Sequence, residues 1–245
     1  MSPSKPDRLI DPADPRWVDL YRIGGITCII LALLVVFAVI AFFIWPYKPG
    51  FTSTLNIFTT LQNDLLGGLI SLDVFFIAGT LLSILPLLAL YVALKPVNES
   101  YALIALTFGL IAVVSLIPAR PISELVFLSN RYAAAADDNA RNQALAAGEA
   151  MLAFFNGTAW MVNIVLAAVS GLISSLLMLR GMIFSKATGY LGMICNIATL
   201  CFFIPIIGIP LLFISTLGGA IWQLMVGRRF LQLAQGKPAA SQPAE

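Results

Sequence analysis

Long, continuously apolar runs separated by short polar segments dominate the pattern of this 245-residue sequence. A helix needs about 20 apolar residues to cross a hydrocarbon core of about 30 Å, because each residue advances the helix by about 1.5 Å. The runs lack the alternation of apolar and polar residues that marks the strands of a membrane β-barrel, so we predict helices. Six runs qualify, at residues 22–45, 69–94, 101–118, 158–179, 188–205 and 207–226.

The predicted fold class is therefore all-α: a polytopic membrane protein built as a bundle of about six transmembrane helices. Composition agrees, because 11% of the residues are charged, whereas soluble domains average about 25%. The first run exceeds the apolar region of a cleaved signal peptide, and we expect it to be retained. We assign residues 1–20 to an N-terminal tail, 21–230 to the transmembrane domain and 231–245 to a C-terminal tail.

The longest polar segment, about residues 119–157, is predicted to form an outer helical hairpin. Pro121 can begin a helix that places Ile122, Leu125, Val126 and Leu128 on one side, and Asp137 or Asp138 can cap a second, alanine-rich helix. Asn156-Gly157 is the expected break before the next span. The hairpin is interpreted either as an amphipathic cover or as a lid over a substrate.

Lysine and arginine are distributed unevenly between the predicted loops. If the N-terminus lies on the inner side of the membrane, ten of the basic residues also lie on the inner side. The outer side then has four, which are Lys48, Arg120, Arg131 and Arg141. Because positively charged loops stay in the cytoplasm, both termini are predicted to be cytoplasmic. The sequence has no basic cluster of the kind that binds nucleic acid, so the expected partner is the lipid bilayer.

The sequence contains no histidine, which excludes haem ligation by histidine, zinc proteases of the HExxH type and serine–histidine dyads. It also lacks a glycine-rich phosphate loop. Its three cysteines, Cys28, Cys195 and Cys201, lie in predicted spans without ligand spacing. We predict no catalytic residue, no cofactor and no metal site. These exclusions leave open a cofactor-free enzyme that uses only carboxylates, but the expected protein is not an enzyme.

Asp73 is the most informative polar residue, since it lies roughly one turn inside the second predicted span. An ionised carboxylate there requires a partner, water or a proton, so Asp73 is a candidate site for a proton, an ion or a solute. The alternative is a structural role, solvated by headgroups or hydrogen-bonded to a neighbour. Asn163 and Asn196 lie in the fourth and fifth spans and could reach Asp73 or each other, or join helices.

Small residues recur at helical spacing on two spans and are predicted to pack helices closely, within the chain or between chains. They are Ala167, Gly171 and Ser175 on the fourth span and Ser215 and Gly219 on the sixth.

Three stretches resemble the DUF4386 family of six-span bacterial membrane proteins. They are YRIGGITCIILALL, ALYVALKPVNESYALIAL, and GMIFSKATGYLGMICNIATL through to IWQLMVGRRFLQL. The resemblance implies an integral protein of the bacterial cytoplasmic membrane and brings no catalytic or binding residue.

Three functional hypotheses follow. The first is a non-enzymatic structural or accessory subunit that packs against a membrane-protein partner or forms a homo-oligomer. The second is a small-solute, ion or proton transporter or channel that uses Asp73. The third is a lipid or apolar-ligand binding protein, which requires an apolar groove beneath Leu125, Leu128, Phe154 and Phe155.

Overall fold

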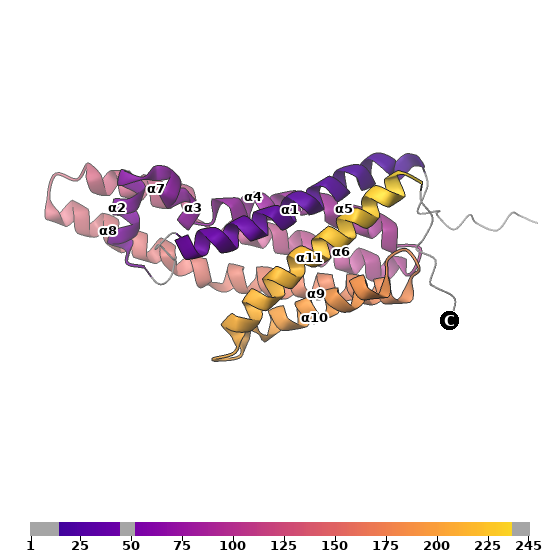
Figure 1. Cartoon of the computed structure of the whole chain (residues 1–245). Helices are drawn as coiled ribbons and strands as arrows, with labels where there is room; N and C mark the ends of the chain where they lie inside the picture. The colour runs from indigo at the N-terminus through magenta and orange to yellow at the C-terminus, as the bar shows by residue number, and fades with distance from the viewer. Residues whose placement is uncertain (1–14, 45–51, 237–245) are drawn as a thin grey trace, which may run out of the picture. The chain divides into compact units, whose positions relative to one another are not determined.

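The computed structural model describes residues 15–44 and 52–236, and every regular element in this part of the chain is a helix (Figure 1). Residues 1–14, 45–51 and 237–245, which hold most of both predicted tails, lie outside the described residues. The elements in chain order are η1 (Pro15–Trp17), α1 (Val18–Ile44), α2 (Thr54–Asn63), α3 (Leu65–Ser71), α4 (Val74–Leu82), α5 (Ile84–Leu94), α6 (Glu99–Leu116), α7 (Ile122–Ala133), α8 (Asp138–Ala153), η2 (Phe154–Asn156), α9 (Thr158–Arg180), α10 (Lys186–Leu200), η3 (Cys201–Phe203) and α11 (Gly208–Ala234).

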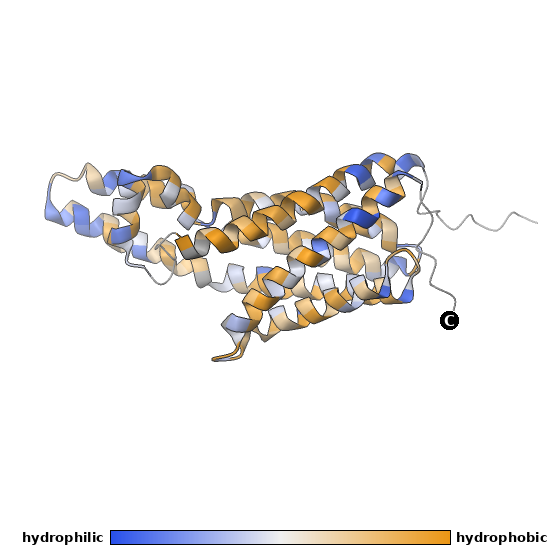
Figure 2. Cartoon of the chain, in the orientation of Figure 1, coloured by the Kyte–Doolittle hydropathy of each residue, from blue (hydrophilic) through white to orange (hydrophobic). Residues whose placement is uncertain are grey.

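Within the described residues, six helical stretches are long and apolar enough to cross a membrane. The all-α fold class is thereby confirmed, and Figure 2 shows apolar residues predominating along α1, α4, α5, α6, α9, α10 and α11. The stretches are Pro15–Ala41, Val74–Leu94, Glu99–Leu116, Asp138–Arg180, Lys186–Phe203 and Pro210–Ala234.

Two helices continue into segments that we had assigned to the tails. Helix α1 starts at Val18, and α11 continues to Ala234. The apolar run predicts only the part of a helix that lies in hydrocarbon, whereas backbone hydrogen bonds also hold helical turns together in water.

The second span is divided into α4 and α5 at Ser83. Proline lacks an N–H and clashes with the carbonyl four residues earlier, so Pro86 disrupts the helix at Leu82. The interruption of this span therefore falls one turn before the proline.

The predicted break before the fourth span is confirmed. Residues Phe154–Asn156 form the 3-10 helix η2, and Gly157 is extended, with ψ of −170°. The break separates the alanine-rich helix α8 from the apolar helix α9.

The chain divides into two compact units, and α1, α4, α6 and α9 each contribute residues to both. The first unit comprises residues up to Leu33, Leu82–Leu110 and Leu166 onward. Its core surrounds the fully buried ring of Phe230, whose centroid lies 5.7 Å from that of Tyr21 and 5.9 Å from that of Phe184.

The second unit comprises Leu34–Leu81 and Ile111–Val165. In it α2, α3, α7 and α8 form a group that we call the hairpin cluster, with Phe58, Leu125 and Phe155 buried in its core. The Asp137 carboxylate accepts a hydrogen bond from the N–H of Ala140 and caps α8, which confirms one of the two predicted caps. Ser129 donates a hydrogen bond of 3.0 Å to the carbonyl of Phe58 and joins α7 to α2. The apolar side predicted for α7 thus packs inside the cluster.

Candidate functional site

Asp73 lies between α3 and α4 and not within a span. Its φ of 65° is left-handed, which ends α3, and its carbonyl accepts hydrogen bonds from the N–H groups of Phe76 and Ile77, which begins α4. Asparagine and aspartate adopt this conformation more readily than most residues. We predicted Asp73 one turn inside the second span, but the apolar helix begins at Val74, directly after it.

The partner of Asp73 is Arg120, in the connection between α6 and α7. Its Nε donates a 3.0 Å hydrogen bond to Oδ2 of Asp73. Its Nη1 donates bonds of 2.9 Å to the carbonyl oxygens of Ala119 and Phe155. The side chain of Arg120 is 4% exposed, so these bonds replace water for a buried charge.

Aromatic rings surround the same guanidinium. Its central carbon lies 4.4 Å from the ring centroid of Trp160, 4.9 Å from that of Phe155 and 5.8 Å from that of Phe76. Such cation–π contacts stabilise a charge that has left water. The rings of Phe76 and Trp160 also meet edge to face, with centroids 5.7 Å apart.

We call these five residues, Asp73, Phe76, Arg120, Phe155 and Trp160, the Arg120 junction. They come from the α3–α4, α6–α7 and α8–α9 connections or the first turns beyond them. These connections link the hairpin cluster to apolar helices, so one arginine side chain fixes all three.

Burial works against both charges of the junction, and pairing supports both. Burial raises the pKa of the Asp73 carboxyl, and the Arg120 guanidinium opposes that shift. Burial lowers the pKa of the Arg120 guanidinium from its ordinary value, and the Asp73 carboxylate opposes that shift. Arginine stays protonated in proteins because its ordinary pKa is so high. The Asp73 carboxylate is bound by Arg120, so the geometry of the junction is that of a structural contact between three connections.

Asn163 and Asn196 each have a separate partner. The buried Asn163 donates a 2.7 Å hydrogen bond to the carbonyl of Ala112, joining α9 to α6. Asn196 donates a 2.7 Å bond to the carbonyl of Gly192, one turn earlier in α10. Asp73 and Asn163 belong to the second unit and Asn196 to the first. Each of the three polar side chains is held by a partner of its own.

Some of the small residues that we predicted to pack helices lie at close contacts, and others do not. Gly171 lies against the amide of Asn196, and the Ser175 hydroxyl lies against Gly192, so α9 and α10 approach closely there. Ser215 is buried and donates to the carbonyl of Leu212. Ala167 is exposed, and Gly219 has no atom within 4 Å of an added Cβ. On α11 the neighbouring Gly218 packs instead, against the sulfur of Cys195.

We expect Gly171→Ala to lower the free energy of unfolding by about 1–3 kcal/mol, because a Cβ would collide with the Asn196 amide. The matched control is Gly219→Ala, which meets no atom and should be neutral or stabilising. Unfolding in mixed micelles measures both. Adding Asn196→Ala should remove most of the Gly171→Ala penalty, and an unchanged penalty would contradict this packing.

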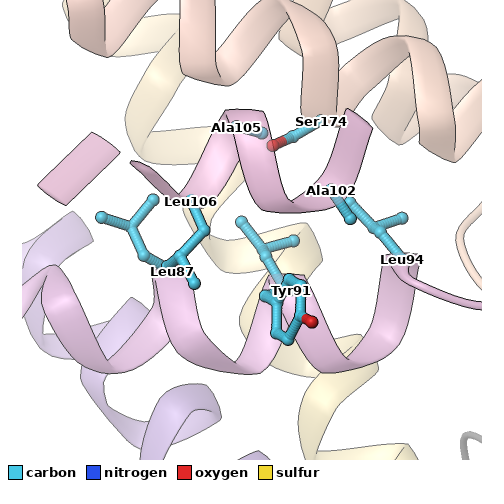
Figure 3. A pocket seen from close by; sticks show the side chains of 8 residues that line it. Leu87, Tyr91, Leu94, Ala102, Ala105, Leu106 and Ser174 are labelled. Atoms are coloured by element: carbon cyan, nitrogen blue, oxygen red, sulfur yellow. The ribbon is translucent and has the colours of Figure 1, made fainter. Parts of the chain in front are cut away.

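A small pocket lies between α5, α6 and α9, all within the first unit (Figure 3). Its volume of about 10 Å³ is the size of one water molecule. It is therefore too small for a lipid or a typical ligand. The lining residues are Leu87, Leu90, Tyr91, Leu94, Ala102, Ala105, Leu106 and Ser174.

The side chains proposed to line an apolar groove mostly fill the core of the hairpin cluster. Leu125, Leu128 and Phe155 are buried there, and Phe154 is 49% exposed. Close packing of these residues against α2 leaves the lipid-binding hypothesis without support from the described residues.

Two buried arginines were missed by sequence reasoning. We counted Arg120 only as a charge of the outer loop, although an arginine beside a proline between two helices, in a chain with an isolated aspartate, was a usable signal. Arg229 donates a 2.6 Å hydrogen bond from Nε to the carbonyl of Ile183 and ties α11 to the α9–α10 loop. No local sequence pattern indicates that contact.

The described residues contain no group of three or more His, Cys, Asp or Glu side chains that could hold a metal ion. The described part of the chain is a helical protein. Its six apolar helices fit a multi-pass membrane protein. The chain matches no protein-family model, no curated protein and no solved structure.

Proposed function

We propose that this chain is a non-enzymatic structural or accessory subunit of the bacterial cytoplasmic membrane, which packs against a partner membrane protein or against copies of itself. The observation that supports this most is the separate pairing of Asp73, Asn163 and Asn196. Arg120 holds Asp73, and backbone carbonyls accept from Asn163 and Asn196. A transport path needs polar groups that a moving solute can reach, whereas groups bound to partners stabilise helix packing.

Charge supports an orientation with both termini in the cytoplasm. The α5–α6 loop contacts the α9–α10 loop, where Val97 lies against Gly181, and Arg229 of α11 binds the latter loop. Basic residues gather at this end of the first unit, and the positive-inside rule assigns such an end to the cytoplasm. The described part of the first unit has seven basic residues, Arg16, Arg22, Lys95, Arg180, Lys186, Arg228 and Arg229, against two acidic residues, Asp19 and Glu99.

The absence of histidine from the sequence supports a role without catalysis. Membership of the DUF4386 family remains part of the proposal. It rests on the three stretches quoted above and on the six-span architecture that they imply.

A transporter or channel that uses Asp73 is the second candidate, because 41% of the Asp73 side chain is exposed. The variant Asp73→Asn separates the two. Asparagine suits the left-handed backbone and removes the charge. Proton and potassium flux should be the same in proteoliposomes with wild type, with this variant and without protein. A wild-type flux that Asp73→Asn abolishes would establish the transporter instead.

A separate experiment tests whether the chain packs against a partner membrane protein or against copies of itself. Purification in native-lipid nanodiscs, followed by cross-linking mass spectrometry, is expected to give either a stoichiometric partner or a defined homo-oligomer. A monomer that carries neither would contradict the accessory role.

A further inference from the structure

The turn between α10 and α11 is apolar throughout. From Phe202 to Ile214 no side chain carries a polar group, and the segment reads FFIPIIGIPLLFI. Turns in water favour glycine, asparagine, aspartate and serine, whose side chains or backbones suit solvent. The exposed residues here are instead large and apolar: Phe203 at 44%, Ile204 at 45%, Ile206 at 95% and Ile207 at 48%.

Ile206 has a conformation that its side chain disfavours. Its φ is 72°, and a β-branched residue in the left-handed region is strained by about 1–3 kcal/mol. Glycine or asparagine would fit without that strain. At 95% exposure, Ile206 gains little from contacts within the chain. Contact with an apolar environment outside the chain would offset that strain by removing the Ile206 side chain from water.

Several backbone donors of the turn are hydrogen-bonded close by along the chain. The N–H groups of Ile204, Ile207 and Gly208 all donate to carbonyls inside the turn, and Pro205 has no N–H. Gly208 closes the turn tightly, because a Cβ there would collide with the carbonyl oxygen of Phe202. Satisfied donors lower the free-energy penalty that hydrocarbon imposes on irregular backbone.

Helix length places the turn at the edge of the hydrocarbon. The first charged residue of α11 is Arg228, twenty residues after Gly208. At about 1.5 Å per residue this separation is about 30 Å, which equals the hydrocarbon thickness of a bilayer. With Arg228 at one headgroup layer, the turn reaches the opposite hydrocarbon boundary and extends little beyond it.

We propose that the α10–α11 turn, Phe203 to Pro210, inserts among lipid acyl chains at the edge of the hydrocarbon layer, with Ile206 in direct contact with lipid. The occupant is lipid because the exposed apolar surface of the turn continues along α11 through Ile214, Leu217 and Ile221. This inference rests on the membrane-spanning role proposed above, and it adds an interaction surface in a segment that would otherwise be a water-exposed loop.

Single cysteines, introduced after Cys28, Cys195 and Cys201 are replaced by alanine, test the proposal. The variants are Ile206→Cys and, at a residue of negative φ, Ile207→Cys, with Leu217→Cys as the span control and Asn139→Cys as the water control. Each is reconstituted in vesicles of phosphatidylcholine and phosphatidylglycerol. One sample of each reconstituted variant is reacted with a charged maleimide. A second sample is labelled with a fluorophore in detergent and is then reconstituted with doxyl-labelled lipid.

Both turn cysteines should react at least about tenfold more slowly than the water control, since thiols in apolar surroundings form little thiolate. Doxyl groups near the glycerol end of the acyl chain should quench their fluorophores more strongly than doxyl groups near the methyl end. Reaction as fast as Asn139→Cys would overturn the proposal. Slow reaction without quenching would mean that protein covers the turn, which also overturns it. An unquenched Leu217→Cys would instead contradict the spanning role itself.

Discussion

Replacing Arg120 by methionine is expected to lower the free energy of unfolding by about 3–5 kcal/mol, because removing one partner leaves a charge without compensation. The change removes the bond to Asp73 and leaves the carbonyl of Phe155 without this donor. Methionine keeps much of the contact with the rings of Phe76 and Trp160, so the loss reports mainly on charge and hydrogen bonds. Reversible unfolding in mixed micelles measures it.

Arg131→Met is the matched control, because Arg131 is an exposed arginine on α7, and surface substitutions usually change stability by about 0.5 kcal/mol or less. Adding Asp73→Asn to Arg120→Met should recover part of the loss, since the uncompensated carboxylate is gone. Equal effects of Arg120→Met and Arg131→Met would mean that the junction does not hold the connections together.

Phe58→Ala should lower the free energy of unfolding by about 3–5 kcal/mol, through lost burial and the cavity that remains. Phe58 is fully buried where α2 meets α7 and α8, and Ser129 binds its carbonyl. We expect faster hydrogen exchange throughout the hairpin cluster, because its helices share this core. Hydrogen exchange with mass spectrometry resolves the effect helix by helix.

The control for Phe58→Ala is Phe127→Ala, the same substitution on α7 at a ring that is 64% exposed. It should leave exchange in the cluster nearly unchanged. If both variants accelerate exchange alike, the cluster does not depend on the Phe58 core.

The number and type of spans were predictable because length and apolarity are local properties of the sequence. The break at Gly157 and the cap at Asp137 were predictable for the same reason, since each follows from nearby residues. The partners that Arg120 binds were not predictable. Its hydrogen bonds to Asp73 and Phe155 join residues 47 and 35 positions apart, and nothing local indicates which connections meet in space.

An error of one position along α11 explains why the predicted packing residue there differs from the observed one. We chose Gly219, but Gly218 faces Cys195. Adjacent residues point about 100° apart around a helix that has 3.6 residues per turn. A spacing of four identifies a stripe of small residues without showing which neighbouring helix it faces.

The most direct test of the account is a cryo-EM structure of the protein in native-lipid nanodiscs prepared without detergent. We predict a closed Asp73–Arg120 pair with Nε to Oδ2 near 3.0 Å, and a partner chain or second copy beside the protein. A hydrated cavity that connects Asp73 to either face of the membrane would contradict the structural role and make transport the leading function.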